Sequence, residues 1–102
     1  DKMNLKSYFV EIILMNSFSP EFMALIPSQR KNVNRLMDEG TIVSYSLALD
    51  RSKVWMVMSA KDTQTIMDVL ASFPLIKFMK PDIHELAFHD NVHSGFPHLS
   101  LN

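Results

Sequence analysis

The fold is decided by residues 41–60, TIVSYSLALDRSKVWMVMSA. Apolar, β-branched and aromatic residues dominate both halves of this stretch, which predicts two strands, residues 41–50 and residues 53–60. A tight turn at Arg51 and Ser52 would join the two strands into an antiparallel hairpin. The turn lacks the Asn-Gly sequence that two-residue hairpin loops prefer, so turn chemistry does not fix the register.

The alternation of side chains favours one register. If Asp50 lies opposite Lys53, one face of the hairpin is almost wholly apolar, with Val43, Tyr45, Leu47, Leu49, Val54, Met56, Met58 and Ala60. A slip by one residue would mix this face with serines and charges, because successive side chains of a strand point to opposite faces. We expect the apolar face to pack against helices.

Two further strands are predicted on either side of the hairpin. Residues 6–15, KSYFVEIILM, are apolar on both faces except at Glu11, which is typical of a central strand. Residues 81–90 predict an edge strand, since Pro81 cannot donate a backbone hydrogen bond. Two apolar residues of that strand lie three positions apart, Ile83 and Leu86, so both can face the core only across a bulge.

Two helices are predicted between these strands. Ser19 is the expected N-cap and Pro20 the first residue of a helix that ends at Gly40. Pro27 lies inside that helix and should kink or split it. Asp62 is the expected N-cap of a second helix, which ends near residue 72.

The resulting β-α-β-β-α-β order predicts an α+β fold, the ferredoxin-like sandwich, over residues 3–90, followed by a C-terminal tail, residues 91–102. Both helices would cover one face of the sheet. The other face would hold Phe9, Ile13, Met15, Trp55 and Val57, an apolar area too large to leave in water. We therefore expect a second copy of the chain to cover it, as a homodimer or within a higher homo-oligomer.

Composition restricts the classes of function. The chain has 102 residues, which fits one domain, and no cysteine, which excludes disulfides, thiolate zinc sites and cysteine nucleophiles. The net charge is −1 with both signs scattered, so nucleic acid is not an expected partner. No apolar stretch approaches the ~20 residues of a membrane span and no N-terminal signal is visible, so we expect a cytoplasmic protein. Neither a metal nor a cofactor is predicted.

The stretch FPLIKFM, residues 73–79, resembles the closing segment of the muconolactone isomerases, together with the Ile83, Leu86 and His89 that follow it. That family shows a Leu-Pro-Leu-aromatic run, an aromatic-Met pair and a last strand ending in Leu-x-x-His. The segment that contains Arg30, Leu36 and Gly40 is similar to the family's first helix.

The resemblance extends over residues 3–90 and implies a dimeric α+β barrel. The implied activity is a proton-shifting isomerisation of a small unsaturated lactone without metal or cofactor. One position departs from the family pattern, because the usual Trp after the helix-ending Gly is replaced here by Ile42, Val43 and Tyr45. This departure implies that the residues lining the substrate site differ from those of the family.

Glu11 is the predicted catalytic base, because a carboxylate facing an apolar dimer cavity would be desolvated and its pKa raised. The alternative is a structural ion pair of Glu11 with Lys53 or Arg30, or a position at the rim of the strand. His84 is the second predicted catalytic residue, as a donor to a developing enolate or a proton carrier. The predicted substrate-binding residues are Arg30 as a carboxylate clamp, Trp55 as an apolar wall, and Ser44, Ser46 and His89.

Three other functions stay open on the sequence. A non-catalytic small-ligand-binding or assembly module of the same fold would use Glu11 only as a structural pair. Haem or oxygen chemistry would need a histidine beside the bound group. A zinc site would have to use His89, His93 and His98, whose spacing fits no regular ligand motif.

Overall fold

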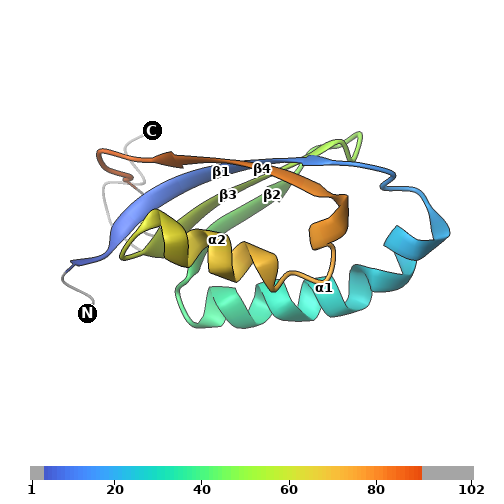
Figure 1. Cartoon of the computed structure of the whole chain (residues 1–102), viewed down its shortest axis with the longest axis horizontal. Coiled ribbons are helices and arrows are strands. Elements are labelled where there is room, and N and C mark those ends of the chain that lie inside the picture. The colour runs from blue at the N-terminus through green and yellow to red at the C-terminus, as the bar shows by residue number, and fades with distance from the viewer. Residues whose placement is uncertain (1–3, 91–102) are drawn as a thin grey trace, which may run out of the picture.

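The computed structural model describes residues 4–90, so the predicted tail with His93 and His98 lies outside the described residues. The elements are β1 (Lys6–Leu14), α1 (Pro20–Asp38), β2 (Ile42–Leu47), β3 (Lys53–Ala60), α2 (Thr63–Ala71), the short 3-10 helix η2 (Ile76–Phe78) and β4 (Met79–Glu85). Their order confirms the predicted βαββαβ chain. The strands form one antiparallel sheet in the order β2-β3-β1-β4, which is the ferredoxin-like topology (Figure 1).

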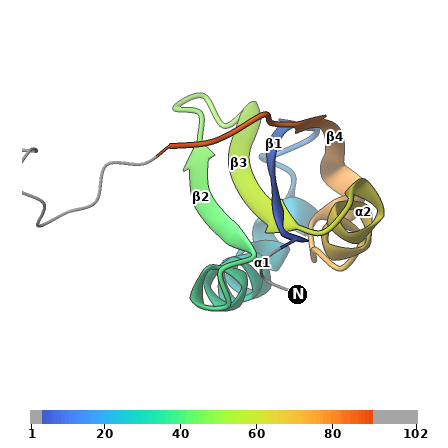
Figure 2. The same ribbon diagram turned by 90° about the vertical axis from the view of Figure 1, so that its left-hand side faces the viewer.

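Both helices lie on the same side of the sheet, which leaves the other face without a helix (Figures 1 and 2). β1 and β3 contribute the centre of the core, with Tyr8, Val10, Ile12 and Met58 fully buried. Val54, Met56 and Ala60 of β3 point to the same side, as the sequence predicts. We call the other side, which carries Phe9, Glu11, Ile13, Trp55 and Val57, the open face.

The hairpin register differs from the predicted one by two residues. Leu47 lies opposite Val54 and Tyr45 opposite Met56. The connection is a five-residue loop, residues 48–52, in which the Ala48 N–H donates to the Lys53 carbonyl at 2.9 Å. Because the shift is an even number of residues, the predicted faces survive, but Leu49 becomes fully exposed.

A bulge changes the face of one residue in β2. The pairing of β2 with β3 shifts between Ile42 and Ser44. Ile42 is therefore buried in the core, whereas Val43 is 39% exposed, so the prediction that Val43 packs in the core is wrong. A bulge places two residues of one strand opposite one residue of the other, which resets the alternation.

The last strand begins and ends earlier than predicted. β4 starts at Met79, and its pairing with β1 shows no bulge between Leu14 and Tyr8. Leu86 follows the strand and its N–H donates to the Ser7 carbonyl at 2.8 Å, so Ile83 and Leu86 need no bulge to be half-buried. The apolar connection before β4 contains η2, which buries Phe78 in edge-to-face contact with Phe22 of α1.

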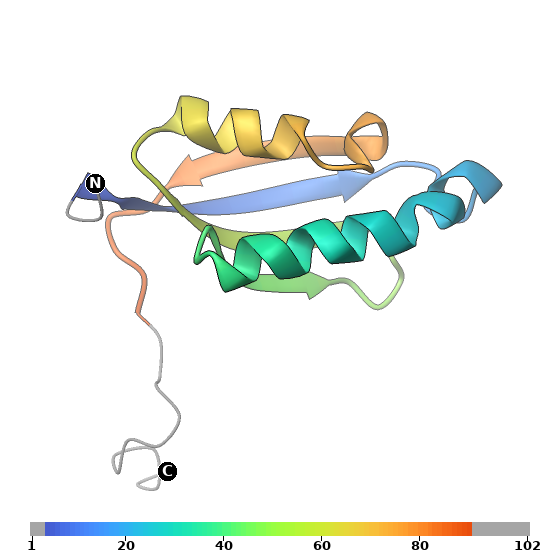
Figure 3. The ribbon, with the colours of Figure 1, turned by 90° about the horizontal axis from the view of Figure 1, so that it is seen from below.

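The helix ends follow the capping residues in the sequence. The Ser19 hydroxyl accepts from the Phe22 N–H at 3.2 Å, and the Asp62 carboxylate accepts from the Thr65 N–H at 2.8 Å. α1 continues through Pro27 as one 19-residue helix, so of the predicted kink or split, the split is wrong (Figure 3). No helix among residues 4–90 is long and apolar enough to cross a membrane.

Tyr8 gives a test of the core. Its side chain is fully buried, and its hydroxyl has no hydrogen-bond partner among the described residues. Tyr8→Phe is expected to leave the free energy of unfolding unchanged or to raise it by about 1 kcal/mol, because a buried unpaired hydroxyl is costly. Urea denaturation followed by circular dichroism measures the difference. A loss above about 1 kcal/mol would show instead that the hydroxyl has a partner in the folded protein.

Candidate functional site

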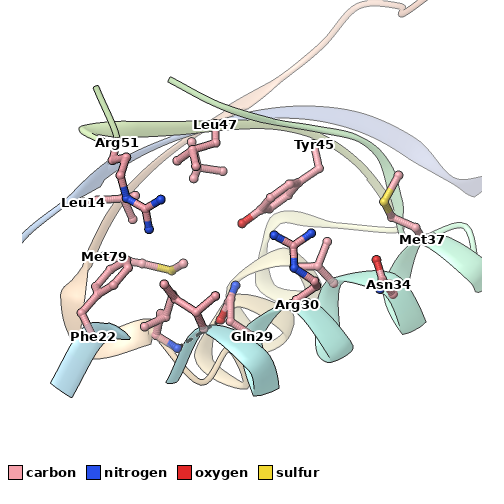
Figure 4. A pocket seen from close by; sticks show the side chains of 14 residues that line it. Leu14, Phe22, Gln29, Arg30, Asn34, Met37, Tyr45, Leu47, Arg51 and Met79 are labelled. Carbon is pink, nitrogen blue, oxygen red and sulfur yellow. Dashed lines mark hydrogen bonds between the residues drawn. The ribbon is translucent and has the colours of Figure 1, made fainter. Parts of the chain in front are cut away.

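A cavity of about 340 Å³ lies between α1 and the β2 side of the sheet (Figure 4). Its polar lining consists of Gln29, Arg30, Asn34, Tyr45 and Arg51. The rest of the lining is apolar and comes from α1, the sheet and the connection before β4: Leu14, Phe22, Ile26, Val33, Met37, Leu47, Val54, Leu75 and Met79. Among residues 4–90, no carboxylate and no histidine lines this cavity.

Two guanidinium groups reach this cavity from different elements. Arg30 extends from α1, and Arg51 extends from the loop between β2 and β3 (Figure 4). Arg51 has a positive φ of 64°, and its guanidinium carbon lies 5.6 Å from the centre of the Phe18 ring. Neither arginine forms an ion pair within residues 4–90. The cavity therefore combines an apolar lining with two positive charges that no carboxylate of the described chain neutralises.

Gln29 is the buried polar residue of the cavity wall, with 4% of its surface exposed. Its side-chain oxygen accepts a hydrogen bond from the Leu75 N–H at 3.1 Å. Its side-chain nitrogen is buried and has no partner among the described residues. Gln29 thus joins α1 to the segment before β4 and leaves one donor unused.

Tyr45 extends from β2 toward the same wall. Burial raises the pKa of the Tyr45 phenol above its ordinary value of 10.0, and a weak hydrogen bond from the Gln29 amide and the charge of Arg30 act in the opposite direction. The raised pKa keeps the phenol protonated at neutral pH. Tyr45 can therefore donate a hydrogen bond in the cavity.

Glu11 lies on the open face, on the opposite side of the sheet from the cavity. It pairs with Trp55 in the register of β1 and β3, and its carboxylate accepts from the indole N–H at 3.0 Å. The Lys53 ammonium donates to the same oxygen at 3.3 Å. These contacts match the alternative of a structural pair with Lys53.

The Glu11 pKa is lowered from its ordinary value of 4.5, chiefly by the hydrogen bond from Trp55 and then by the hydrogen bond and charge of Lys53. The predicted rise in the Glu11 pKa is therefore wrong for the chain as described. Desolvation acts in the predicted direction but is the weaker effect, because both neighbours favour the charged carboxylate. The role of Glu11 as a base stays a prediction.

The other predicted residues divide between the two sides of the sheet. Ser44 and Ser46 lie opposite Val57 and Trp55 and so face the open side. His84 contacts Asp82 at 3.0 Å on the same face, and both side chains are more than half exposed. The structure therefore brings four predicted residues into the neighbourhood of Glu11.

Arg30 and His89 do not join that group. Arg30 is separated from Glu11 by the sheet, and it lines the cavity instead. His89 is exposed beyond the end of β4. Among residues 4–90 no cluster of three or more potential metal ligands is present, and two histidines of the zinc alternative lie outside that range.

Comparison with known families agrees with this architecture. The family model for muconolactone delta-isomerase matches residues 15–92, which is most of the chain. The chain belongs to the muconolactone delta-isomerase family. This confirms the resemblance found in the sequence and places the βαββαβ fold among the dimeric α+β barrels.

A solved structure shares the fold. An uncharacterized protein from Thermotoga maritima superposes with a TM-score of 0.53 at 12% sequence identity, covering 80% of this chain and 98% of that one. This likeness concerns the fold alone. No curated protein matches the chain.

Of the polar residues that line the cavity, only Arg30 belongs to the sequence-based set, and Gln29 and Arg51 are among those that it lacks. Gln29 occupies a gap in the apolar stripe of α1, between Phe22 and Ile26 on one side and Val33 on the other. A polar residue at a buried helical position is a signal that the sequence offers. Arg51 offers no such signal, because its position depends on a loop whose length the sequence did not reveal.

The Glu11 contacts predict an optical titration. Trp55 is the one tryptophan in the sequence, so its fluorescence reports on the carboxylate that it contacts. The emission should titrate with a midpoint below 4.5, and Glu11→Gln should abolish this transition. Because the folded pKa is the lower one, ionised Glu11 stabilises the protein above its ordinary pKa. That contribution is lost as pH falls through the folded value.

The Glu11→Gln variant is also the control for the titration of the other carboxyl groups, because it keeps all of them and removes only the carboxyl group of Glu11. Unfolding measured at neutral and acid pH should show a stability difference between the two proteins that shrinks in acid. A fluorescence midpoint at or above the ordinary value would contradict the lowered pKa and would restore the desolvated base that the sequence predicts.

Proposed function

We propose that the protein acts on a small organic acid with an apolar body, which it binds in the cavity between α1 and the sheet, and that the reaction is a cofactor-independent isomerisation. The observation that carries the choice of ligand is the pair of guanidinium groups, Arg30 and Arg51, in an otherwise apolar cavity. Guanidinium groups bind carboxylates through charge-assisted hydrogen bonds. Membership of the muconolactone delta-isomerase family supports the reaction class.

The size of the cavity suits such a ligand. A volume of about 340 Å³ falls within the range of small-molecule sites. Burying an apolar body against Phe22, Leu47 and Met79 would supply most of the affinity, and the guanidinium groups would select for charge and orientation. Tyr45 supports proton chemistry, because a protonated phenol can stabilise a ligand oxygen that gains negative charge.

One observation favours a second candidate, a non-catalytic carrier or sensor of the same ligand class. Moving a proton requires a base, and the described residues that line the cavity include neither a carboxylate nor a histidine. The two candidates differ in one measurable property. An isomerase of this type should exchange C–H protons next to a ligand carbonyl with solvent deuterium, whereas a carrier should leave them in place.

Substitution of the guanidinium groups tests the ligand class. Arg30→Met and Arg51→Met should each weaken binding of 4-phenylbutanoate by about 10- to 100-fold, because a charge-assisted bond is lost. Binding of the neutral 4-phenylbutanamide should change much less. Isothermal titration calorimetry measures both ligands.

Arg35→Met is the matched control, since Arg35 lies on the same helix but pairs with Glu39 and does not line the cavity. Equal losses in the control and the cavity variants would reject the guanidinium sites. Failure of the unmodified protein to bind the acid would reject the proposal as a whole.

We also propose that the open face forms a homodimer interface. Phe9 is 36% exposed and Ile13 48% exposed on this face, beside Trp55. Charges of both signs border them, with Lys53 and Lys80 next to Ile13 and Asp82 next to Glu11. A face with this mixture can pair with itself, and the family's dimeric architecture supports a second copy as the occupant.

Ile13→Glu is expected to convert the dimer into a monomer, because the new carboxylate would be buried between the sheets. Met23→Glu is the matched control, since Met23 is also 48% exposed but lies on α1. Sedimentation equilibrium measures both variants. A monomeric unmodified protein, or a dimer that survives Ile13→Glu, would reject this interface.

A further inference from the structure

The orientation of the Gln29 amide is fixed by a backbone contact. The oxygen and nitrogen of a glutamine side chain are otherwise interchangeable in shape. Here the Leu75 N–H lies 3.1 Å from one of these atoms, and because a backbone N–H can only donate, that atom must be the oxygen. The nitrogen must then point the other way, into the cavity (Figure 4).

This nitrogen is a buried donor without a hydrogen bond of normal geometry. Gln29 is 4% exposed, and its nitrogen has no partner among the described residues. Such a donor costs stability, since the amide has lost its water contacts and gained at most a weak contact with the Tyr45 oxygen. A ligand atom that accepts from it would recover the lost hydrogen bond.

A second donor faces Gln29. The Tyr45 hydroxyl points toward the Gln29 nitrogen from the opposite wall, with the Arg30 guanidinium near both (Figure 4). Burial raises the pKa of Tyr45, so the phenol keeps its proton at neutral pH. Two uncharged donors, one from α1 and one from β2, therefore converge on the same part of the cavity.

We infer that Gln29 is a specificity-determining residue, whose amide nitrogen and the Tyr45 hydroxyl donate together to one uncharged carbonyl oxygen of the ligand. A carbonyl oxygen has two lone pairs and can accept from both donors at once. The ligand carboxylate is bound separately by the guanidinium groups. This inference rests on the proposed organic-acid cavity. It adds the requirement that the ligand has a carbonyl group, which recognition of charge alone does not impose.

Two probes that differ only in a carbonyl test the inference. The unmodified protein should bind 4-oxo-4-phenylbutanoate about tenfold more tightly than 4-phenylbutanoate, because two neutral hydrogen bonds are gained. Isothermal titration calorimetry gives both dissociation constants, and their ratio is the measured quantity. Both probes carry the same charge and the same apolar ring, so the ratio isolates the carbonyl.

Gln29→Glu is the most informative variant. It has the same shape and keeps the oxygen that accepts from Leu75, but it removes the donor. Measured at mildly alkaline pH, where the new carboxylate is ionised, the preference for the keto acid should fall to about threefold or less. The added negative charge repels the carboxylate of both probes and also the carbonyl oxygen of the keto acid, so both the lost donor and the new charge lower the ratio.

Asn32→Asp is the matched control. Asn32 also lies on α1, its side-chain oxygen accepts from Arg35 at 2.7 Å, and its nitrogen is likewise buried without a partner. It does not line this cavity, so the control should leave the ratio unchanged. Tyr45→Phe, which removes the other donor from a half-buried position, gives an independent reading if Gln29→Glu does not fold.

The outcomes separate this inference from the proposed function. If neither acid binds the unmodified protein, the organic-acid cavity itself is rejected. If both acids bind equally well, the cavity stands and the carbonyl subsite is rejected. A preference that survives both Gln29→Glu and Tyr45→Phe would also reject the subsite, because the carbonyl would then be recognised elsewhere.

Discussion

The pairing of β1 with β3 is the constraint on which the rest of the molecule depends. It runs without interruption from Lys6 opposite Ala60 to Ile13 opposite Lys53. Because side chains alternate along both strands, this register assigns every residue of the sheet centre to one of two environments. Tyr8, Val10 and Ile12 lie under the helices, and the residues between them lie on the open face. The sheet thereby separates the Glu11 contacts, on the open face, from the cavity, on the helix side, although β1 and β3 contribute residues to both.

The same alternation explains what the sequence could predict. Strand faces follow from a period of two, so the core positions and the open face were predictable from β1 and β3 alone. The capping residues Ser19 and Asp62 carry their own chemistry, so the helix starts were predictable as well. The hairpin loop was not predictable in this way. Arg51 adopts a positive φ, and the loop has no glycine or asparagine that would indicate such a conformation.

The candidate site was harder to predict because it depends on contacts between distant elements. Gln29 is functional in our proposal only because Leu75, forty-six residues away, fixes its amide. Arg51 reaches the cavity only because a five-residue loop carries it there. Sequence reasoning placed the site beside Glu11, since a carboxylate between apolar neighbours is visible in a single strand, whereas a glutamine oriented by a remote backbone group is not.

Glu11 shows why position on an apolar face does not by itself raise a pKa. Desolvation penalises its charge, but an indole N–H and an ammonium group contact the same oxygen and favour the charge more strongly. A second copy packed on the open face would remove water from all three groups together. The Coulomb attraction between Glu11 and Lys53 would then grow as the local dielectric constant falls, so burial would not by itself turn this carboxylate into a base.

The Tyr8 hydroxyl and the Gln29 nitrogen are two of the buried polar atoms that lack a partner in the described chain, and they differ in their surroundings. The Tyr8 hydroxyl lies in the packed core, away from the cavity lining, so its cost has no compensation there. The Gln29 nitrogen lies in the wall of a cavity that a ligand can enter. An unpaired buried donor is unfavourable in the empty protein, and this is the reason that it can discriminate between ligands. An acid without a carbonyl besides its carboxylate leaves the donor unpaired, whereas one with a suitably placed carbonyl restores the missing hydrogen bond.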